Sequence, residues 1–222
     1  MSFTQNKTKC AVFDLDGTLI NTITDLKNAC EYVMKVHGFK AEWDESDYKR
    51  FVGNGMKKLV ERAFDHTLSE EQLNEYLMEF KAYYNAHMLD NTRAYDGISE
   101  QLKALKEKGI KLCVVTNKAE PSAVEIIETL FGKGTFDVIV GQRDGLPVKP
   151  DPVGVFEALK ELGCTADEAL YFGDSNVDMQ TAINAKVKAV GVTWGFRSYD
   201  ELNALSPFKI INTPAEITKL FL

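Results

Sequence analysis

The chain has 222 residues, with 26 Lys and Arg against 33 Asp and Glu, which gives a formal net charge of −7. Proteins that bind phosphate backbones carry a basic face, so this acidic chain without a dense Lys/Arg block excludes nucleic acid and anionic membranes as general partners. Hydrophobic residues make up 45% of the chain and charged residues 27%, as in an ordinary globular protein long enough to form two domains.

Cysteine usage and the N-terminal sequence bear on localisation. The cysteines are far apart and form no C-x-x-C pair, and residues 1–10 contain no apolar stretch like that of a signal peptide. No segment approaches the ~20 consecutive apolar residues of a membrane-spanning helix. We therefore expect a cytoplasmic protein with no membrane partner, and its oligomeric state can be monomer or homodimer.

Short apolar, β-branched runs alternate along the chain with longer segments of helical periodicity. In chain order, a strand is predicted at 11–13, helices at 23–37, 44–51, 56–64, 69–87 and 98–108, a strand at 111–115, a strand at 136–140, a helix at 152–162, and strands at 169–172 and 187–192. Repeated strand–helix–strand order predicts an α/β fold with a doubly wound parallel sheet.

The region between about residues 22 and 90 departs from this alternation, because it has consecutive helical patterns and no convincing strand. We interpret it as a helical insert in the sheet domain. The predicted organisation is a core formed by residues 1–20 and 92–222, with a helical domain at 21–91. The alternative is one large irregular domain.

Polar residues follow the predicted strands at the points where each strand ends. In an open parallel sheet, ligands bind beyond the carboxyl ends of the strands, so we expect these side chains to meet at one edge. They are Asp14 and Asp16 after the first strand, Thr116, Asn117 and Lys118 after the second, Lys149 after the third, and Asp174 and Asp178 after the fourth.

Three of these aspartates form a candidate metal site. Asp14 and Asp16 are two residues apart at a strand end, Gly17 permits a sharp turn, and Asp174 adds another oxygen donor. Such oxygen donors suit a hard cation, so Mg²⁺ is the predicted metal. The histidines all lie in the helical insert without metal-ligand spacing, which argues against zinc.

A metal beside Lys149 and Thr116 indicates a site for a phosphoryl group. One carboxylate can attack phosphorus, while a second gives a proton to the leaving oxygen and later takes one from water. The predicted aspartates and Lys149 sum to −4 + 1 = −3, which would repel a phosphate dianion unless a metal cation is bound. Taken singly, each motif also fits a turn, a helix cap or a surface loop, and only their joint placement favours a site.

The sequence resembles the haloacid dehalogenase-like superfamily in four motifs. They are Asp14-Leu15-Asp16-Gly17-Thr18-Leu19, Val114-Val115-Thr116-Asn117, Lys149-Pro150, and Gly173-Asp174 through Asp178. The motifs occur in the family's order and cover nearly the whole chain. The resemblance implies an α/β fold, with a Rossmann-like parallel sheet core, helices on both faces and an inserted α-helical cap domain.

The resemblance also implies roles for the first three motifs. Asp14 would be the nucleophile and a Mg²⁺ ligand, and Asp16 would be the acid/base, with its backbone carbonyl on the metal. Thr116 and Lys149 would bind the transferring phosphoryl group. An aspartate at position 16 is typical of the superfamily's phosphatases and absent from its dehalogenases.

Three further roles follow from the same resemblance. Asn117 would lend a hydrogen-bond donor to the substrate. Asp174 would be a Mg²⁺ ligand, and Asp178 would support the metal indirectly.

Within the superfamily, the sequence most resembles the phosphoglycolate phosphatases. Residues 52–63 resemble their cap signature, while residues 21–26 occupy the place of their hinge with Asn-Thr instead of the usual Asp-Ser. Gly53, Asn54 and Gly55 would present backbone amides to a small carboxylate if the cap closes over the site. The alternative is an ordinary turn between helices.

The leading hypothesis is therefore a Mg²⁺-dependent phosphatase that hydrolyses a small phosphorylated metabolite, 2-phosphoglycolate first, through an aspartyl-phosphate. A pyrophosphatase and a β-phosphoglucomutase-like phosphomutase of the same fold are alternatives. A non-catalytic binding protein is disfavoured, because both Asp14 and Lys149 are present.

Overall fold

A computed structural model describes residues 8–221 of the chain. They divide into two compact units, one formed by the described residues up to Leu19 together with those from Ala94 onward, and the other by Ile20–Arg93. Residues 1–7, which the predicted core includes, lie outside the described residues.

The first unit is built on a six-stranded sheet in the order β5-β4-β1-β6-β7-β8, in which all neighbouring strands run parallel. The strands are β1 (Cys10–Phe13), β4 (Lys111–Ala119), β5 (Val138–Gln142), β6 (Ala169–Gly173), β7 (Lys188–Val192) and β8 (Lys209–Ile211). Every residue of β1 and β6 is buried, as expected for central parallel strands covered on both faces. The prediction of an α/β fold with a parallel sheet is confirmed.

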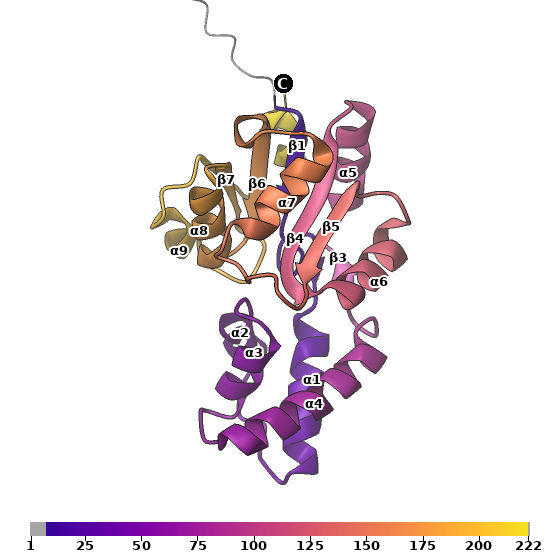
Figure 1. Cartoon of the computed structure of the whole chain (residues 1–222). Coiled ribbons are helices and arrows are strands. Elements are labelled where there is room, and N and C mark those ends of the chain that lie inside the picture. The colour runs from indigo at the N-terminus through magenta and orange to yellow at the C-terminus, as the bar shows by residue number, and fades with distance from the viewer. Residues whose placement is uncertain (1–7, 222) are drawn as a thin grey trace, which may run out of the picture. The chain divides into compact units, whose positions relative to one another are not determined.

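Helices cover both faces of this sheet (Figure 1). They are α5 (Ile98–Glu107), α6 (Glu120–Phe131), α7 (Val153–Leu162), α8 (Asn176–Ala185) and α9 (Tyr199–Asn203), with 3₁₀ turns η1 (Ala166–Glu168) and η2 (Pro214–Leu220). On one face, α7 and α8 pack against alternate strand residues such as Val12 and Tyr171. On the other, Phe13 and Phe172 stack with their ring centroids 4.8 Å apart, and Phe172 also stacks on Phe221. The period-2 alternation of strands thus supplies two buried layers.

The second unit is helical. Its helices are α1 (Ile23–Val36), α2 (Glu45–Phe51), α3 (Met56–Ala63) and α4 (Glu70–His87). Capping boxes begin α2 at Asp44 and α4 at Ser69, so the sequence itself specifies where these helices start. The long helices α1 and α4 pack against each other. No helix in the described part of the chain has both the length and the apolar character that crossing a bilayer requires.

The chain enters and leaves the helical unit at one place. Two short strands, β2 (Ile20–Asn21) and β3 (Arg93–Ala94), pair there as a two-stranded sheet. Beside them, the buried carboxylate of Asp25 accepts hydrogen bonds from the backbone N–H groups of Asn91 and Thr92, from the Asn91 amide and from the Thr92 hydroxyl. One side chain near the start of the unit is therefore hydrogen-bonded to residues near its end.

Candidate active site

The polar residues that follow the strands gather at the carboxyl ends of β1, β4 and β6. Asp14 follows β1 directly, and Asp174 follows β6. Because β1 and β6 are parallel neighbours in register, the two aspartates leave the sheet side by side. The sheet topology therefore brings together residues that lie 160 positions apart in sequence (174 − 14 = 160).

Three buried aspartates form the centre of the site. Asp14, Asp174 and Asp178 each offer a carboxylate oxygen, and these oxygens all lie within 4.8 Å of one another. Like charges this close repel, so the cluster needs a compensating cation. The chain itself supplies part of that charge.

The ammonium group of Lys149 lies between two of these carboxylates. Its Nζ is 2.7 Å from Oδ1 of Asp14 and 2.7 Å from Oδ1 of Asp178. Burial alone would lower the pKa of Lys149, but the charges of Asp14 and Asp178 hold that pKa well above its usual range. Burial, followed by the charge of Asp178, raises the pKa of Asp14 well above its usual range, and Lys149 only partly opposes this. The cluster has more negative charge than one ammonium group can balance.

Asp178 is held from three sides. The backbone N–H and the hydroxyl of Ser175 both donate to its Oδ2, while Lys149 and the Tyr171 hydroxyl donate to its Oδ1. Both oxygens are thus engaged within the protein. This geometry suits a residue that positions Lys149 better than one that offers itself to a ligand.

Asp174 is also fixed by its neighbours. The Thr18 hydroxyl donates to Oδ1 at 3.2 Å, and the backbone N–H of Phe196 donates to Oδ2 at 2.7 Å. Burial and the charge of Asp178 raise the pKa of Asp174 to about 7, although these hydrogen bonds and the charge of Arg197 act in the opposite direction. A carboxyl group with this pKa ionises readily when a cation binds next to it.

Asp16 lies next to a second lysine. The Nζ of Lys118 is 2.9 Å from Oδ1 and 3.2 Å from Oδ2 of Asp16, and the Lys118 side chain is only 3% exposed. With this ammonium group included, the formal charge of the site becomes −4 + 2 = −2 instead of the −3 summed from the sequence. A single divalent cation would neutralise it.

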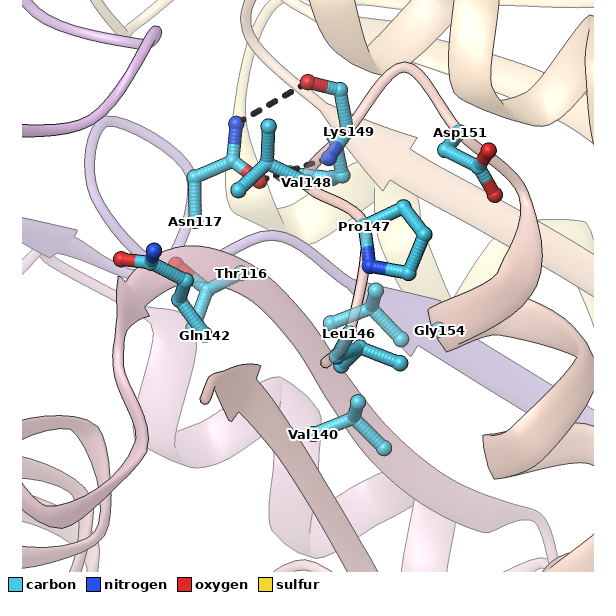
Figure 2. Close-up of a pocket in the computed structure, with 11 residues that line it drawn as sticks. Thr116, Asn117, Val140, Gln142, Leu146, Pro147, Val148, Lys149, Asp151 and Gly154 are labelled. Carbon is cyan, nitrogen blue, oxygen red and sulfur yellow. Dashed lines mark hydrogen bonds between the residues drawn. The ribbon is translucent and has the colours of Figure 1, made fainter. Parts of the chain in front are cut away.

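Thr116 and Asn117 line a pocket with the Lys149 loop (Figure 2). The Asn117 side chain accepts a hydrogen bond from the backbone N–H of Lys149 at 2.8 Å and donates one to its carbonyl oxygen at 3.2 Å. This pair of bonds ties the loop to the end of β4. The side chain of Asn117 therefore acts on the backbone that carries Lys149, whereas its predicted role is to bind substrate.

Gly53, Asn54 and Gly55 belong to the helical unit, where they form the turn before α3. Both glycines have positive φ, +118° at Gly53 and +85° at Gly55. Residues with a side chain rarely adopt this backbone conformation. The guanidinium of Arg62 donates to Oδ1 of Asn54 at 2.9 Å and to the carbonyl oxygen of Phe51 at 2.7 Å. The turn is thus held in one shape by α3.

Sequence reasoning did not identify the partner of Lys118, and it assigned no role to Tyr171 or Ser175. Lys118 was visible as a polar residue after a strand, but its partner was not, because the pairing with Asp16 joins two separate loops. Tyr171 lies inside β6 and carries no sequence signal beyond that of a buried aromatic residue. Ser175 could have been found from the Ser175–Asp178 spacing, which is that of a capping box.

Comparison with known proteins identifies the family. The sequence model of the haloacid dehalogenase-like hydrolases matches residues 11–192. The chain belongs to this family. The resemblance seen in the sequence motifs is confirmed, and so is the prediction that the chain is a phosphatase, because the two curated relatives described next, which it matches along most of their length, are phosphatases.

Individual family members match over most of their length. The chain is 34% identical to the phosphoglycolate phosphatase of Aquifex aeolicus, covering 94% of each protein. It is 32% identical to that of Colwellia psychrerythraea, covering 88% of this chain and 89% of the relative. A crystal structure from Lactobacillus delbrueckii subsp. bulgaricus, of a protein assigned as a phosphoglycolate phosphatase without proof of activity, superposes with a TM-score of 0.91 at 33% identity and covers 97% of this chain and 99% of that one.

The donor set of this family member fits a divalent metal ion. Asp14 and Asp174 are buried carboxylates with raised pKa, and their cluster keeps a formal negative charge after both lysines are counted. The donors are oxygens, which hard cations prefer. The backbone at Gly17 also lies close to the carboxylate of Asp174. A Cβ at position 17 would be 2.3 Å from Oδ2 of Asp174, so any residue other than glycine would clash with this carboxylate.

Proposed function

We propose that the protein is a Mg²⁺-dependent phosphatase that hydrolyses a small phosphorylated metabolite, with 2-phosphoglycolate as the first candidate substrate. The observation that carries this proposal is the ammonium group of Lys149, 2.7 Å from Oδ1 of Asp14, within a buried carboxylate cluster at the carboxyl ends of the strands. A nucleophile beside a fixed cation suits attack on a phosphoryl group, whose oxygens carry negative charge.

Asp14 is the proposed nucleophile. One of its carboxylate oxygens attacks phosphorus, a new P–O bond forms to Asp14, and the bond from phosphorus to the leaving oxygen breaks. Water then attacks the aspartyl-phosphate and releases inorganic phosphate. Lys149 and the Thr116 hydroxyl bind the phosphoryl oxygens during both steps, and this requires that they stay fixed.

Asp16 is the proposed acid and base. It gives a proton to the leaving oxygen in the first step and takes one from the attacking water in the second. Its carboxyl group lies two residues along the chain from Asp14, on the turn that Gly17 permits with φ +90°. Support for this assignment comes from its location beside Asp14.

Mg²⁺ held by Asp14, Asp174 and the backbone carbonyl of Asp16 would supply the positive charge that a phosphate dianion needs here. Asp178 would keep Lys149 in place, because both of its oxygens already accept hydrogen bonds from the protein.

We also propose that residues 21–91 act as a cap, in which Gly53, Asn54 and Gly55 bind the carboxylate of the substrate through backbone amides. The substrate proposal follows the relatives from A. aeolicus and C. psychrerythraea, which are named phosphoglycolate phosphatases. The positive φ of both glycines is consistent with a turn whose backbone amides can bind an anion.

The test is phosphate release by the purified chain from 2-phosphoglycolate, sugar phosphates, pyrophosphate and β-glucose 1-phosphate, with Mg²⁺ and with excess chelator. We expect the highest kcat/KM for 2-phosphoglycolate. Chelator and Asp14→Asn should each lower it by at least about 10³-fold, because one removes the cation and the other the nucleophile.

One control variant and the possible contrary outcomes make the result specific. Asp144→Asn changes an exposed turn residue outside the site and should leave activity unchanged. Full activity of Asp14→Asn would refute the mechanism. A higher kcat/KM for pyrophosphate, or isomerisation of glucose 1-phosphate without phosphate release, would replace the substrate proposal by a pyrophosphatase or a phosphomutase.

A further inference from the structure

The end of β4 is irregular where it reaches the site. Val115 pairs with Val140 and Ala119 with Gln142, so β4 advances four residues while β5 advances two. A strand with extra residues bends locally and turns its side chains in new directions. Thr116, Asn117 and Lys118 all fall within this irregular segment.

The three side chains of this segment have different partners. Asn117 binds the backbone of Lys149, while the Thr116 hydroxyl accepts a hydrogen bond from the backbone N–H of Lys118 at 3.1 Å. The latter bond fixes the backbone from which the Lys118 side chain extends. That side chain is 3% exposed and reaches Asp16, which follows a different strand.

The contact between Lys118 and Asp16 involves both carboxylate oxygens. Nζ lies 2.9 Å from Oδ1 and 3.2 Å from Oδ2, so the ammonium group faces the middle of the carboxylate. A carboxylate bound at one oxygen can rotate about that bond, whereas contact at both oxygens restricts χ2 of the aspartate as well as χ1. Burying the ammonium group of Lys118 costs free energy of desolvation, and an exposed ion pair would stabilise the fold about equally well. The buried contact is therefore not explained by stability alone.

We propose that Lys118 is a positioning residue for the leaving-group step, which holds the carboxyl group of Asp16 in the orientation from which it donates its proton. In that step the proton moves from Asp16 to the leaving oxygen as the ester P–O bond breaks and the P–O bond to Asp14 forms. Lys118 itself forms no bond to phosphorus and transfers no proton. The inference rests on the proposed role of Asp16.

Leaving groups of different basicity test this role. An alkyl alkoxide is a poor leaving group and needs a well-placed acid, whereas p-nitrophenolate leaves without one. A loss of Asp16 orientation should therefore slow hydrolysis of alkyl phosphates selectively. A general disturbance of the site should slow both substrate types equally.

The experiment compares kcat/KM of wild type and Lys118→Met on p-nitrophenyl phosphate and on the alkyl phosphate that the wild type hydrolyses fastest. The ratio kcat/KM is used because it ends at phosphoryl transfer and omits the later hydrolysis of the aspartyl-phosphate. We expect the loss on the alkyl phosphate to exceed the loss on p-nitrophenyl phosphate by at least about tenfold. Removing the charge of Lys118 should weaken the binding of any phosphate dianion, and this loss cancels from the comparison because it applies to both substrates alike.

Lys9→Met is the matched control, because Lys9 forms an ion pair with Glu168 in the same unit, outside the site. It should leave both rates unchanged. If Lys118→Met does not fold, Lys118→Gln removes the charge while keeping a polar end, and the same ratio is measured.

Equal losses on both substrates, or no loss on either, would overturn the proposal. The outcome is separate from the substrate proposal above, because the comparison uses any alkyl phosphate that the wild type hydrolyses. A chain that fails on 2-phosphoglycolate can still show the selective effect of Lys118→Met.

Discussion

The carboxyl group of Asp174 links metal binding, pH and stability in a single residue. Its pKa is raised from 3.8 to about 7, first by burial and then by the charge of Asp178. Below about pH 4 the group is protonated in the folded and the unfolded chain, so it adds no pH dependence. Between about pH 4 and 7 the folded chain binds a proton that the unfolded chain has lost. The metal-free fold therefore loses stability as pH rises through this window.

Asp174→Asn should stabilise the metal-free protein at neutral pH while abolishing activity. Asparagine can still accept from the Phe196 N–H, and it carries no charge. We expect its free energy of unfolding to exceed that of the wild type by ~2 kcal/mol at pH 8, with ~4 kcal/mol as the upper bound set by the pKa shift. Urea unfolding in chelator at pH 5 and pH 8 measures this.

The difference in the free energy of unfolding between Asp174→Asn and the wild type should grow from pH 5 to pH 8. Asp144→Asn, on the exposed turn, should show no such growth. Mg²⁺ should raise the melting temperature of the wild type and have no effect on Asp174→Asn. If the difference in the free energy of unfolding between variant and wild type stayed constant with pH, the charge of Asp174 would not be what destabilises the metal-free fold.

Single residues also show which features of the site can be predicted from the sequence. The aspartates and Lys149 could be placed at one sheet edge because each lies at or shortly after the end of a predicted strand, and parallel strands end together. The partner of each side chain could not be predicted. Whether Lys118 contacts Asp16 or another group depends on the irregular end of β4, and no local pattern specifies that irregularity.

Helix α8 is an element whose first turn is part of the site. Ser175 is its N-cap, and the Ser175 hydroxyl accepts from the backbone N–H of Asp178 at 3.2 Å while donating to the Asp178 carboxylate. Asp178 thus caps the helix with one oxygen and contacts Lys149 with the other. Helix α9 starts with the same capping box, formed by Ser198 and Glu201, without any link to Lys149.

The two capping boxes give a matched pair of variants. Ser175→Ala and Ser198→Ala should each lower the free energy of unfolding by ~1 kcal/mol through the loss of a cap. Ser175→Ala should in addition lower kcat/KM by about tenfold or more, because Asp178 and therefore Lys149 lose a restraint. Ser198→Ala should leave kcat/KM within about twofold of the wild type. Equal activity of both variants would mean that the cap of α8 serves the fold alone.

At the scale of elements, most strands were predictable and some helices were not. Five β-branched apolar runs correspond to β1, β4, β5, β6 and β7 within a few residues. The edge strand β8 was missed because it has three residues, too few for a pattern. Helix α8 was also missed, since it begins inside the polar run that carries Asp174 and Asp178, and its apolar periodicity is weak.

The whole molecule is proposed to close and open during each catalytic cycle. Water must be kept out while phosphorus is transferred and admitted for hydrolysis of the aspartyl-phosphate. The proposed hinges are the two chain crossings at β2 and β3, which are short and adjacent.

Small-angle X-ray scattering checks this motion. With Mg²⁺ and orthovanadate, a phosphate mimic, we expect a smaller radius of gyration than with Mg²⁺ alone, because the bound anion attracts the cap. Lys149→Met, which cannot bind the mimic, should show no difference between the two conditions. Superimposable wild-type profiles would contradict closure.

The hydrogen bonds of Asp25 with Asn91 and Thr92 bear on which parts of the chain can change during evolution. Since the helical unit starts and finishes at paired strands, its interior can gain, lose or exchange helices without altering the spacing of Leu19 and Tyr95, which are joined by a backbone hydrogen bond of 3.1 Å. The catalytic groups would be unaffected by such a change. If the helical unit selects the substrate, as proposed, evolution or design can replace its helices without changing the residues that carry out the reaction.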